Sequence, residues 1–176
     1  VLKIRENSFE AIVEELQIYN LSTTSDDVKG IAFEQFLGKT FRGELGQFFT
    51  PREVVKMIVN VLPINNNSKV LDTSCGSGGF LLYALDKVRK QADEYYEDGT
   101  AEHFRFWHDF AEKRLFGIEI NEQISRTAKM NMIIHDDGHT NVITYDGLKP
   151  LKHIPDDTGN QHFKEDSFDF ILTNPP

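Results

Sequence analysis

The chain has 176 residues, a net charge of -9 at pH 7, 39% hydrophobic residues and 27% charged residues. These values are typical of one globular domain with a single core, and they exclude a disordered chain. No apolar run approaches the ~18 residues of a membrane span, and the one cysteine excludes an internal disulfide, so we expect a cytoplasmic protein without a membrane partner.

Residues 1–46 are predicted to form a small N-terminal helical segment. A first helix is indicated by apolar residues at spacings of three and four, namely Phe9, Ile12, Val13 and Leu16. A second is predicted after the capping-box-like residues 24–27. Its inward positions are Val28, Ile31, Ala32 and Leu37. A glycine-rich connector over residues 38–46 is expected to follow.

The sequence TPRE at residues 50–53 predicts a further helix start. Thr50 can cap the free backbone amides, Pro51 suits the first helical position, and Glu53 can reach back to the cap. The expected helix ends at Pro63. Its buried stripe consists of Val54, Val55, Ile58, Val59 and Leu62.

From residue 69 onward, short apolar runs alternate with helical patterns. Strands are predicted at residues 69–72, 114–120, 141–147 and 167–173. Helices are predicted from about Gly78, within residues 91–113 after the turn at 97–100, and over residues 121–134. This alternation predicts the α/β class with a parallel, doubly wound sheet.

Each predicted strand ends on a polar residue: Asp72, Glu119, Asp146 and Asn174. In open parallel sheets, ligands bind in the crevice outside the carboxyl ends of the strands. The first strand also leads into a glycine-rich turn that lets a ligand approach the backbone. The alternative interpretation is that these residues are ordinary polar strand ends beside a tight turn, with no ligand bound.

The turn does not match the motifs that bind phosphate groups. The third glycine of a dinucleotide fingerprint would fall at Leu81, and the GKT at residues 38–40 lacks the earlier glycine of a phosphate loop. Glu119 can accept both hydroxyls of a ribose, or it is a carboxylate at a helix start. Asp146 can accept from an adenine amino group, or it forms an Asx turn. Together these acids suit S-adenosylmethionine, a phosphate-free cation, and no metal site is predicted.

The final NPP suits the activation of an adenine amino group. Two acceptors, the amide oxygen of Asn174 and the carbonyl of Pro175, can hold its N–H bonds so that the lone pair points at a methyl group. Proline fixes the backbone and brings no competing N–H. The target base would also have to leave its helix. The alternative is a plain turn after a strand.

In this context the chain resembles the amino-group DNA methyltransferases, specifically the modification subunit of type I restriction-modification systems. The resemblance rests on GQFFTPREVV, VLDTSCGSGGFLL, FGIEINEQISRTAKMNMIIH, YDGL and FDFILTNPP, in that order. It implies that Asn174, Pro175 and Pro176 bind the target amine, that Glu119 holds the ribose and that Asp146 holds the adenine.

The resemblance also implies which residues surround the rest of the cofactor. The residues expected at its methionine end are Gln47, Phe48, Phe49, Thr50, Pro51, Arg52, Asp72, Ser74, Cys75 and Gly76. The remaining expected cofactor residues are Gly78, Phe80, Ile120, Gly147 and Leu148.

A Rossmann-like S-adenosylmethionine-dependent methyltransferase core is therefore expected over residues 47–176, truncated after the fourth strand. The family motif continues from the second proline into an aromatic residue, so the fragment is expected to bind cofactor and to be inactive alone. Specificity and restriction subunits are implied as partners, and the -9 charge without a Lys/Arg run indicates weak or absent binding of double-stranded DNA by this chain alone. Alternatives are an amino-methyltransferase of protein glutamine or RNA, which QFFTPRE disfavours, and a non-catalytic scaffold.

Overall fold

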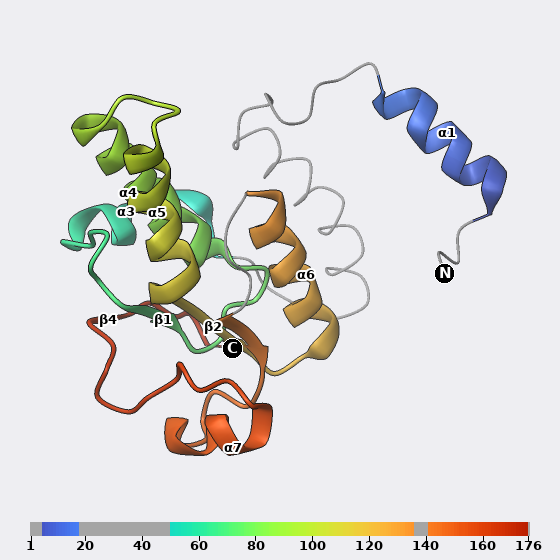
Figure 1. Cartoon of the computed structure of the whole chain (residues 1–176). Coiled ribbons are helices and arrows are strands. Elements are labelled where there is room, and N and C mark those ends of the chain that lie inside the picture. The colour runs from blue at the N-terminus through green and yellow to red at the C-terminus, as the bar shows by residue number, and fades with distance from the viewer. Residues whose placement is uncertain (1–4, 18–49, 136–140, 176) are drawn as a thin grey trace. The chain divides into compact units, whose positions relative to one another are not determined.

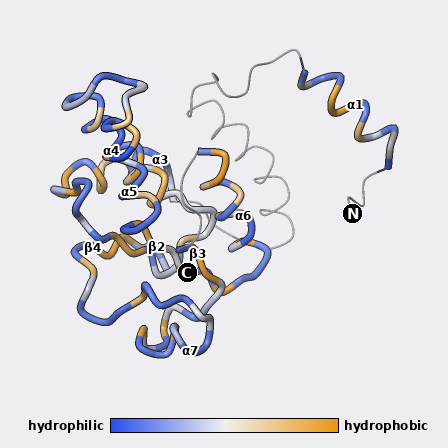
Figure 2. Tube along the Cα trace, viewed as in Figure 1, coloured by the Kyte–Doolittle hydropathy of each residue, from blue (hydrophilic) through white to orange (hydrophobic). Residues whose placement is uncertain are grey.

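The computed structural model describes residues 5–17, 50–135 and 141–175, and the chain divides into two compact units, Val1–Thr40 and Phe41–Pro176. In the first unit the predicted first helix is confirmed as α1, Glu6–Leu16. Three apolar residues of α1 (Figures 1 and 2), Phe9, Ile12 and Val13, are 42–48% exposed. The second predicted helix, the glycine connector and the boundary after residue 46 lie outside the described residues and stay predictions.

The second unit is built on a parallel four-stranded sheet, as the alternating pattern predicts. Its strands are β1 (Val70–Asp72), β2 (Leu115–Glu119), β3 (Val142–Thr144) and β4 (Phe170–Ile171), in the order β3-β2-β1-β4. Every neighbouring pair is parallel. The α/β class is thereby confirmed.

The strands β3 and β4 are shorter than predicted. Pairing nevertheless continues past the assigned ends of β4, because Asp169 N–H donates to the carbonyl of Lys69 and Leu172 N–H donates to that of Leu71, both at 2.9 Å. The exposed side chain of Asp169 also accepts from the Lys69 backbone N–H at 2.7 Å.

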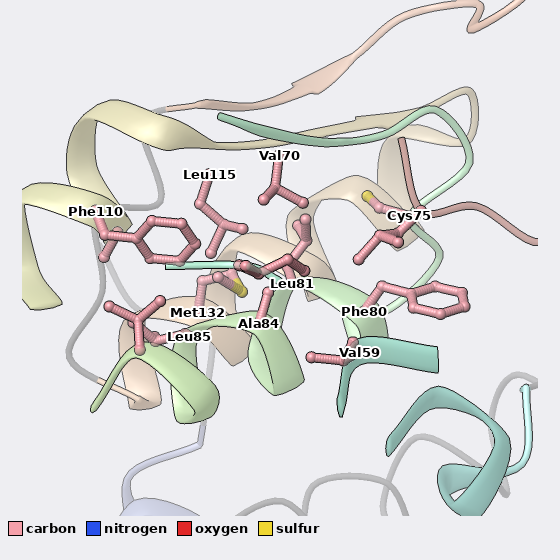
Figure 3. Close-up of a cluster of buried hydrophobic side chains, with 14 of the residues drawn as sticks. Val59, Val70, Cys75, Phe80, Leu81, Ala84, Leu85, Phe110, Leu115 and Met132 are labelled. Atoms are coloured by element: carbon pink, nitrogen blue, oxygen red, sulfur yellow. The ribbon is translucent and has the colours of Figure 1, made fainter. Parts of the chain in front are cut away.

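Different layers cover the two faces of the sheet, and successive strand residues point to opposite layers. Val70 and Leu115 belong to a core shared with α3 (Arg52–Val61), α4 (Gly79–Tyr95), α5 (Ala101–Arg114) and α6 (Glu122–Ile134) (Figures 1 and 3). Leu71 and Phe116 belong to a second cluster with residues of the β3–β4 connection. That connection contains the short helices η2 (Leu151–His153) and α7 (Ile154–Thr158).

The predicted helices after β1 and β2 are confirmed, and their starts follow from local chemistry. Asn121 caps α6 by accepting from the backbone N–H groups of Gln123 and Ile124, and Thr100 caps α5 by accepting from His103, as these residue types commonly do. Among the described residues, no helix combines the length and apolar character needed to cross a membrane.

The start of α3 differs from the prediction. Pro51 occupies the N-cap position, its carbonyl accepts from Val54 N–H at 2.9 Å, and α3 has no side-chain cap. The predicted capping by Thr50 is therefore wrong, because the helix begins one residue later. Val54 is 40% exposed rather than buried, since α4 covers only one side of α3.

Candidate functional site

The carboxyl ends of the strands meet beside the point where the strand order reverses. The chain runs from β1 outward through β2 to β3, and then crosses back to place β4 on the other side of β1. Such a switch point is where parallel sheets hold ligands. Asp72 ends β1, and Thr173 and Asn174 follow β4, so these residues stand on the two sides of the switch point.

Asp72 is the most deeply buried acid at this edge, with 1% of its surface exposed. Its Oδ1 accepts from the backbone N–H of Ser74 at 3.1 Å. Burial raises the pKa of Asp72 to about 7; the hydrogen bonds from Ser74 and Thr173 oppose that rise, and the charge of Glu119 adds to it. The carboxyl group is thus poised between its neutral and ionised forms near physiological pH.

The turn after β1 is fastened to β2. Cys75 N–H donates to the carbonyl of Ile118 at 2.8 Å, and Gly76 N–H donates to Oε2 of Glu119 at 3.0 Å. Gly76 and Gly78 have φ values of +55° and +93°, which other residues rarely adopt. The turn therefore presents backbone rather than side chains at the strand ends.

Two residues that were expected near the cofactor, Cys75 in this turn and Phe80 at the start of α4, pack into the core. Cys75 and Phe80 are each 5% exposed, and Figure 3 shows both side chains at one end of the main core cluster. Burial is the largest cause that raises the pKa of the Cys75 thiol well above its usual value, and the charges of Asp72 and Glu119 raise it further. If these residues line a ligand, only small parts of their side chains are available.

Glu119, the last residue of β2, links this strand to the glycine turn through its carboxylate. It is 5% exposed, and its Oε1 accepts from the backbone N–H of Asn121 at 2.9 Å while its Oε2 accepts from Gly76. A carboxylate oxygen can accept two hydrogen bonds, so each oxygen retains acceptor capacity. Its predicted contact with a ribose stays a prediction.

The loop after β3 lies directly against the turn after β1. A Cβ atom at Gly147 would sit 2.2 Å from the carbonyl oxygen of Thr73, so only glycine fits this approach. Asp146 accepts from Leu148 N–H at 3.0 Å, which is the Asx turn considered as its alternative. Two apolar side chains flank the strand ends in the open: Ile120 is 69% exposed and Leu148 is 96% exposed.

The end of β4 contacts both the glycine turn and the start of α3. Asn174 Nδ2 donates to Thr50 Oγ1 at 3.0 Å, across 124 residues of sequence. Arg52 follows Pro51 as the first residue of α3. Of the other predicted site residues, Pro175 is exposed, whereas Gln47, Phe48, Phe49 and Pro176 lie outside the described residues.

Sequence reasoning missed Thr173, whose hydroxyl contacts two residues of the first turn across the switch point. Its Oγ1 lies 3.1 Å from Thr73 Oγ1 and 2.6 Å from Ser74 Oγ. The signal available in the sequence was a hydroxyl residue directly before Asn174. Its partner segments, however, become neighbours only when β4 pairs with β1.

A surface hollow also lies away from this edge, between α3 and α4, beside Lys56, Tyr83, Lys87 and Gln91. The ammonium of Lys87 already donates to the carbonyls of Val59, Asn60 and Leu62 at the end of α3, so we assign the hollow a structural role. Among the described residues, no three His, Cys, Asp or Glu side chains gather to hold a metal ion.

Comparison with known proteins places this arrangement in a family. A family model described as N-6 DNA Methylase matches residues 24–176. The chain is 32% identical over 153 residues to the type I restriction enzyme MjaIX methylase subunit of Methanocaldococcus jannaschii, covering 85% of this chain and 23% of that protein. It is 32% identical over 124 residues to the type II restriction enzyme and methyltransferase RM.BcgI of Heyndrickxia coagulans, covering 69% and 18%.

Solved structures give the same result. The crystal structure of a type I modification subunit from Vibrio vulnificus aligns with a TM-score of 0.60 and 27% identity, over 87% of this chain and 29% of that one. The EcoKI M protein aligns with a TM-score of 0.53 and 25% identity, over 74% and 25%. The chain thus spans about a quarter of the length of these relatives.

Proposed function

Because the chain belongs to the N-6 DNA methylase family, we propose that it forms the S-adenosylmethionine-binding core of an adenine-specific DNA methyltransferase that acts as a type I modification subunit. The observation that carries this proposal is the hydrogen bond between Asn174 and Thr50. It joins the segment predicted to hold the target amine to the segment predicted to hold the cofactor, at the carboxyl edge of a parallel sheet.

The residues at this edge fit the proposed cofactor. Asp72 and Glu119 are buried acids, and a nearby positive charge would favour their ionised forms. Glu119 keeps acceptor capacity for ribose hydroxyls, and the exposed side chains of Ile120 and Leu148 offer apolar surface for an adenine ring. S-adenosylmethionine would supply an activated methyl group here.

The chain's own part in the reaction is positioning. Asn174 Oδ1 and the carbonyl of Pro175 would accept the two N–H bonds of the target amine and orient its lone pair. The donor side of the Asn174 amide is occupied by Thr50, which leaves the oxygen side to accept. Acceptors held in advance lower the barrier without a covalent intermediate.

DNA binding and partner subunits belong to the same proposal. The chain has a net charge of -9 and no run of basic residues, so other segments or chains would supply most of the contacts to phosphates. Three of the four relatives belong to type I restriction enzymes, which supports specificity and restriction subunits as partners. We further propose that these 176 residues bind cofactor without methylating duplex DNA alone. The family match favours DNA over protein glutamine or RNA as the substrate.

Isothermal titration calorimetry with S-adenosylmethionine tests the proposal. We expect saturable binding, and Glu119→Ala should weaken it by about 1–3 kcal/mol, the range for a lost charge-assisted hydrogen bond. The matched control is Glu122→Ala, which removes an exposed carboxylate three residues away that pairs with Arg126. No heat at millimolar cofactor would refute cofactor binding, and equal affinity of both variants would remove Glu119 from the site. Far-UV circular dichroism verifies that each variant is folded.

A further inference from the structure

Asn131 is a buried polar side chain of α6 that contacts the glycine turn after β1. It is 4% exposed, and its Nδ2 donates to the backbone carbonyl of Ser77 at 2.9 Å, across 54 residues of sequence. A carbonyl can only accept, so it binds the amino side of the amide. The amide oxygen, Oδ1, is buried and has no hydrogen-bond partner among the described residues. The side chain of Asn131 is thus directed at the turn through a single bond.

The backbone of the turn explains why the carbonyl of Ser77 needs this donor. Gly78, the N-cap of α4, has a left-handed conformation with φ +93° and ψ 21°. The first bond of α4 runs from Leu82 N–H to the carbonyl of Gly78, and within the described part of the chain no backbone N–H donates to the carbonyl of Ser77. A partly buried carbonyl outside the helical ladder is costly unless another group donates to it. Asn131 supplies that donor from the neighbouring helix.

The same face of α6 also packs against the turn. A Cβ atom at Gly78 would lie 3.5 Å from Met132 Sδ and 4.0 Å from Ala128 Cβ. Residues 128, 131 and 132 are three and four positions apart, so they share one face of the helix. Van der Waals contacts have no direction, whereas the bond from Asn131 determines how the peptide between Ser77 and Gly78 is rotated.

The other bonds of the turn involve its N–H groups. Gly76 N–H donates to Oε2 of Glu119 at 3.0 Å, and Gly78 N–H donates to the carbonyl of Cys75 at 2.8 Å. These bonds fix the peptides before and after the one that joins Gly76 to Ser77. The carbonyl of Ser77 is held from α6.

An alternative partner for the Ser77 carbonyl exists in α4 itself. Leu81 lies four residues further along the chain, which is the spacing of a helical hydrogen bond. A bond from Leu81 N–H would extend α4 toward its N-terminus, and it would require Gly78 to leave its left-handed conformation. Asn131 therefore stabilises the observed turn relative to a longer α4.

We propose that Asn131 is a positioning residue of the proposed cofactor site, which holds the glycine turn in its left-handed form from α6. Because its side chain is buried, it acts through the carbonyl of Ser77 rather than by touching a ligand. The consequence for S-adenosylmethionine rests on the proposed function, since the turn lies beside Asp72 and Glu119. The hold on the turn is a property of the cofactor-free chain.

Asn141 provides a matched control at the amino ends of the strands, where it directly precedes β3. It is 1% exposed, its Nδ2 donates to the carbonyl of Glu112 at 2.7 Å, and its buried Oδ1 also has no partner among the described residues. Leucine at either position removes one donor and one unsatisfied oxygen at similar volume. Asn131→Leu and Asn141→Leu should therefore have comparable effects on stability and differ in their effect on the turn. Asn131→Ala and Asn141→Ala form a second pair that adds no bulk.

Calorimetry with S-adenosylmethionine measures the effect on the proposed site of the 176-residue chain. Asn131→Leu should weaken cofactor binding by about tenfold, the factor that corresponds to one buried hydrogen bond. Asn141→Leu should bind the cofactor as the wild type does. Urea unfolding of both variants shows whether their stabilities are comparable, so that a loss of affinity in Asn131→Leu alone is separated from a general loss of stability.

Nuclear magnetic resonance of the cofactor-free chain measures the turn itself. In the wild type, one side-chain amide proton of Asn131 should exchange slowly with solvent, because it is bonded to Ser77. The ¹³C carbonyl signal of Ser77 and the ¹⁵N amide signal of Gly78 should shift in Asn131→Leu and Asn131→Ala. Both signals should keep their wild-type positions in the Asn141 variants.

Three results would overturn the inference. The first is a wild type in which both side-chain amide protons of Asn131 exchange as fast as those of an exposed Asn, which is measurable even if no variant folds. The second is an unchanged Ser77 carbonyl signal in the Asn131 variants. The third is a wild type that binds cofactor together with Asn131 and Asn141 variants of equal affinity. A wild type without cofactor heat would instead refute the proposed function, and the resonance signals would still decide whether Asn131 holds the turn.

Discussion

Replacement of Asp72 by asparagine should change the pH dependence of stability with a defined sign. The pKa of Asp72 is about 7 in the folded chain, compared with 3.8 for an ordinary Asp. The folded state therefore binds the proton more tightly, and its advantage is complete below the unfolded pKa and is lost as the pH rises through 7. The amide side chain of the variant does not titrate, so Asp72→Asn should remove this loss.

The magnitude follows from the two pKa values. At about 1.4 kcal/mol per pH unit, the stability of Asp72→Asn relative to wild type should rise steadily from about pH 4 to about pH 7, by about 4 kcal/mol in total. Below this window the variant should be less stable, because the amide nitrogen of the new side chain leaves a buried donor without a partner, at a cost of about 1–3 kcal/mol. Above it the variant should be the more stable protein.

Urea unfolding of both proteins at half-unit pH intervals measures this difference. Asp109→Asn is a control of opposite sign. The pKa of Asp109 is lowered by its hydrogen bond from Lys113, so that carboxylate contributes stability above its unfolded pKa. Its loss should therefore destabilise the chain at neutral pH and not under strong acid. A stability difference between Asp72→Asn and wild type that stays flat from pH 4 to pH 7 would refute the assignment of a raised pKa to Asp72.

Two further substitutions test the packing that supports the site. Gly147→Ala should destabilise the chain by about 1–3 kcal/mol, because its Cβ would meet the carbonyl oxygen of Thr73 at 2.2 Å. The control Gly79→Ala, whose Cβ would have no atom within 4 Å, should be neutral or stabilising. Equal effects of the two substitutions in thermal unfolding would contradict the close approach at Gly147. Lys87→Met keeps the aliphatic stem but removes the ammonium that donates to three carbonyls at the end of α3. We expect a loss of about 1 kcal/mol, given its partial exposure. Lys113→Met, at an exposed pair with Asp109, should cost less in urea unfolding, and the reverse order would exclude the capping role.

The order and type of the elements in the second unit follow from the sequence because they depend on local patterns. The spacing of Leu81, Leu85 and Val88 predicts α4, and the cap at Asn121 predicts α6; both are present. The apolar pattern is less informative about burial, because neighbouring elements determine which side chains are covered. Val54 fits the apolar stripe of α3 as well as Val55 does, but only Val55 is buried, because the position of α4 determines which side of the stripe is covered.

The candidate site is predictable to the extent that parallel strands align their carboxyl ends. That rule groups Asp72, Glu119 and Asn174 correctly near one edge of the sheet. It gives no distances between segments that are remote in sequence. The contacts of Thr173 with the first turn and of Asn174 with Thr50 require the crossover that places β4 beside β1, and no local pattern indicates them.

The burial of acids at this edge, which supports the proposed cofactor site, is costly for the fold alone. An ionised Asp72 is buried beside the carboxylate of Glu119, and burial is the main reason that its pKa rises. A cation bound at the edge would favour the ionised form and offset that cost, whereas an anion would add to it. The chain therefore carries a local electrostatic preference for a positively charged ligand, independently of any family relationship. For the fold alone, a neutral side chain at position 72 would be more favourable at neutral pH than the buried carboxylate.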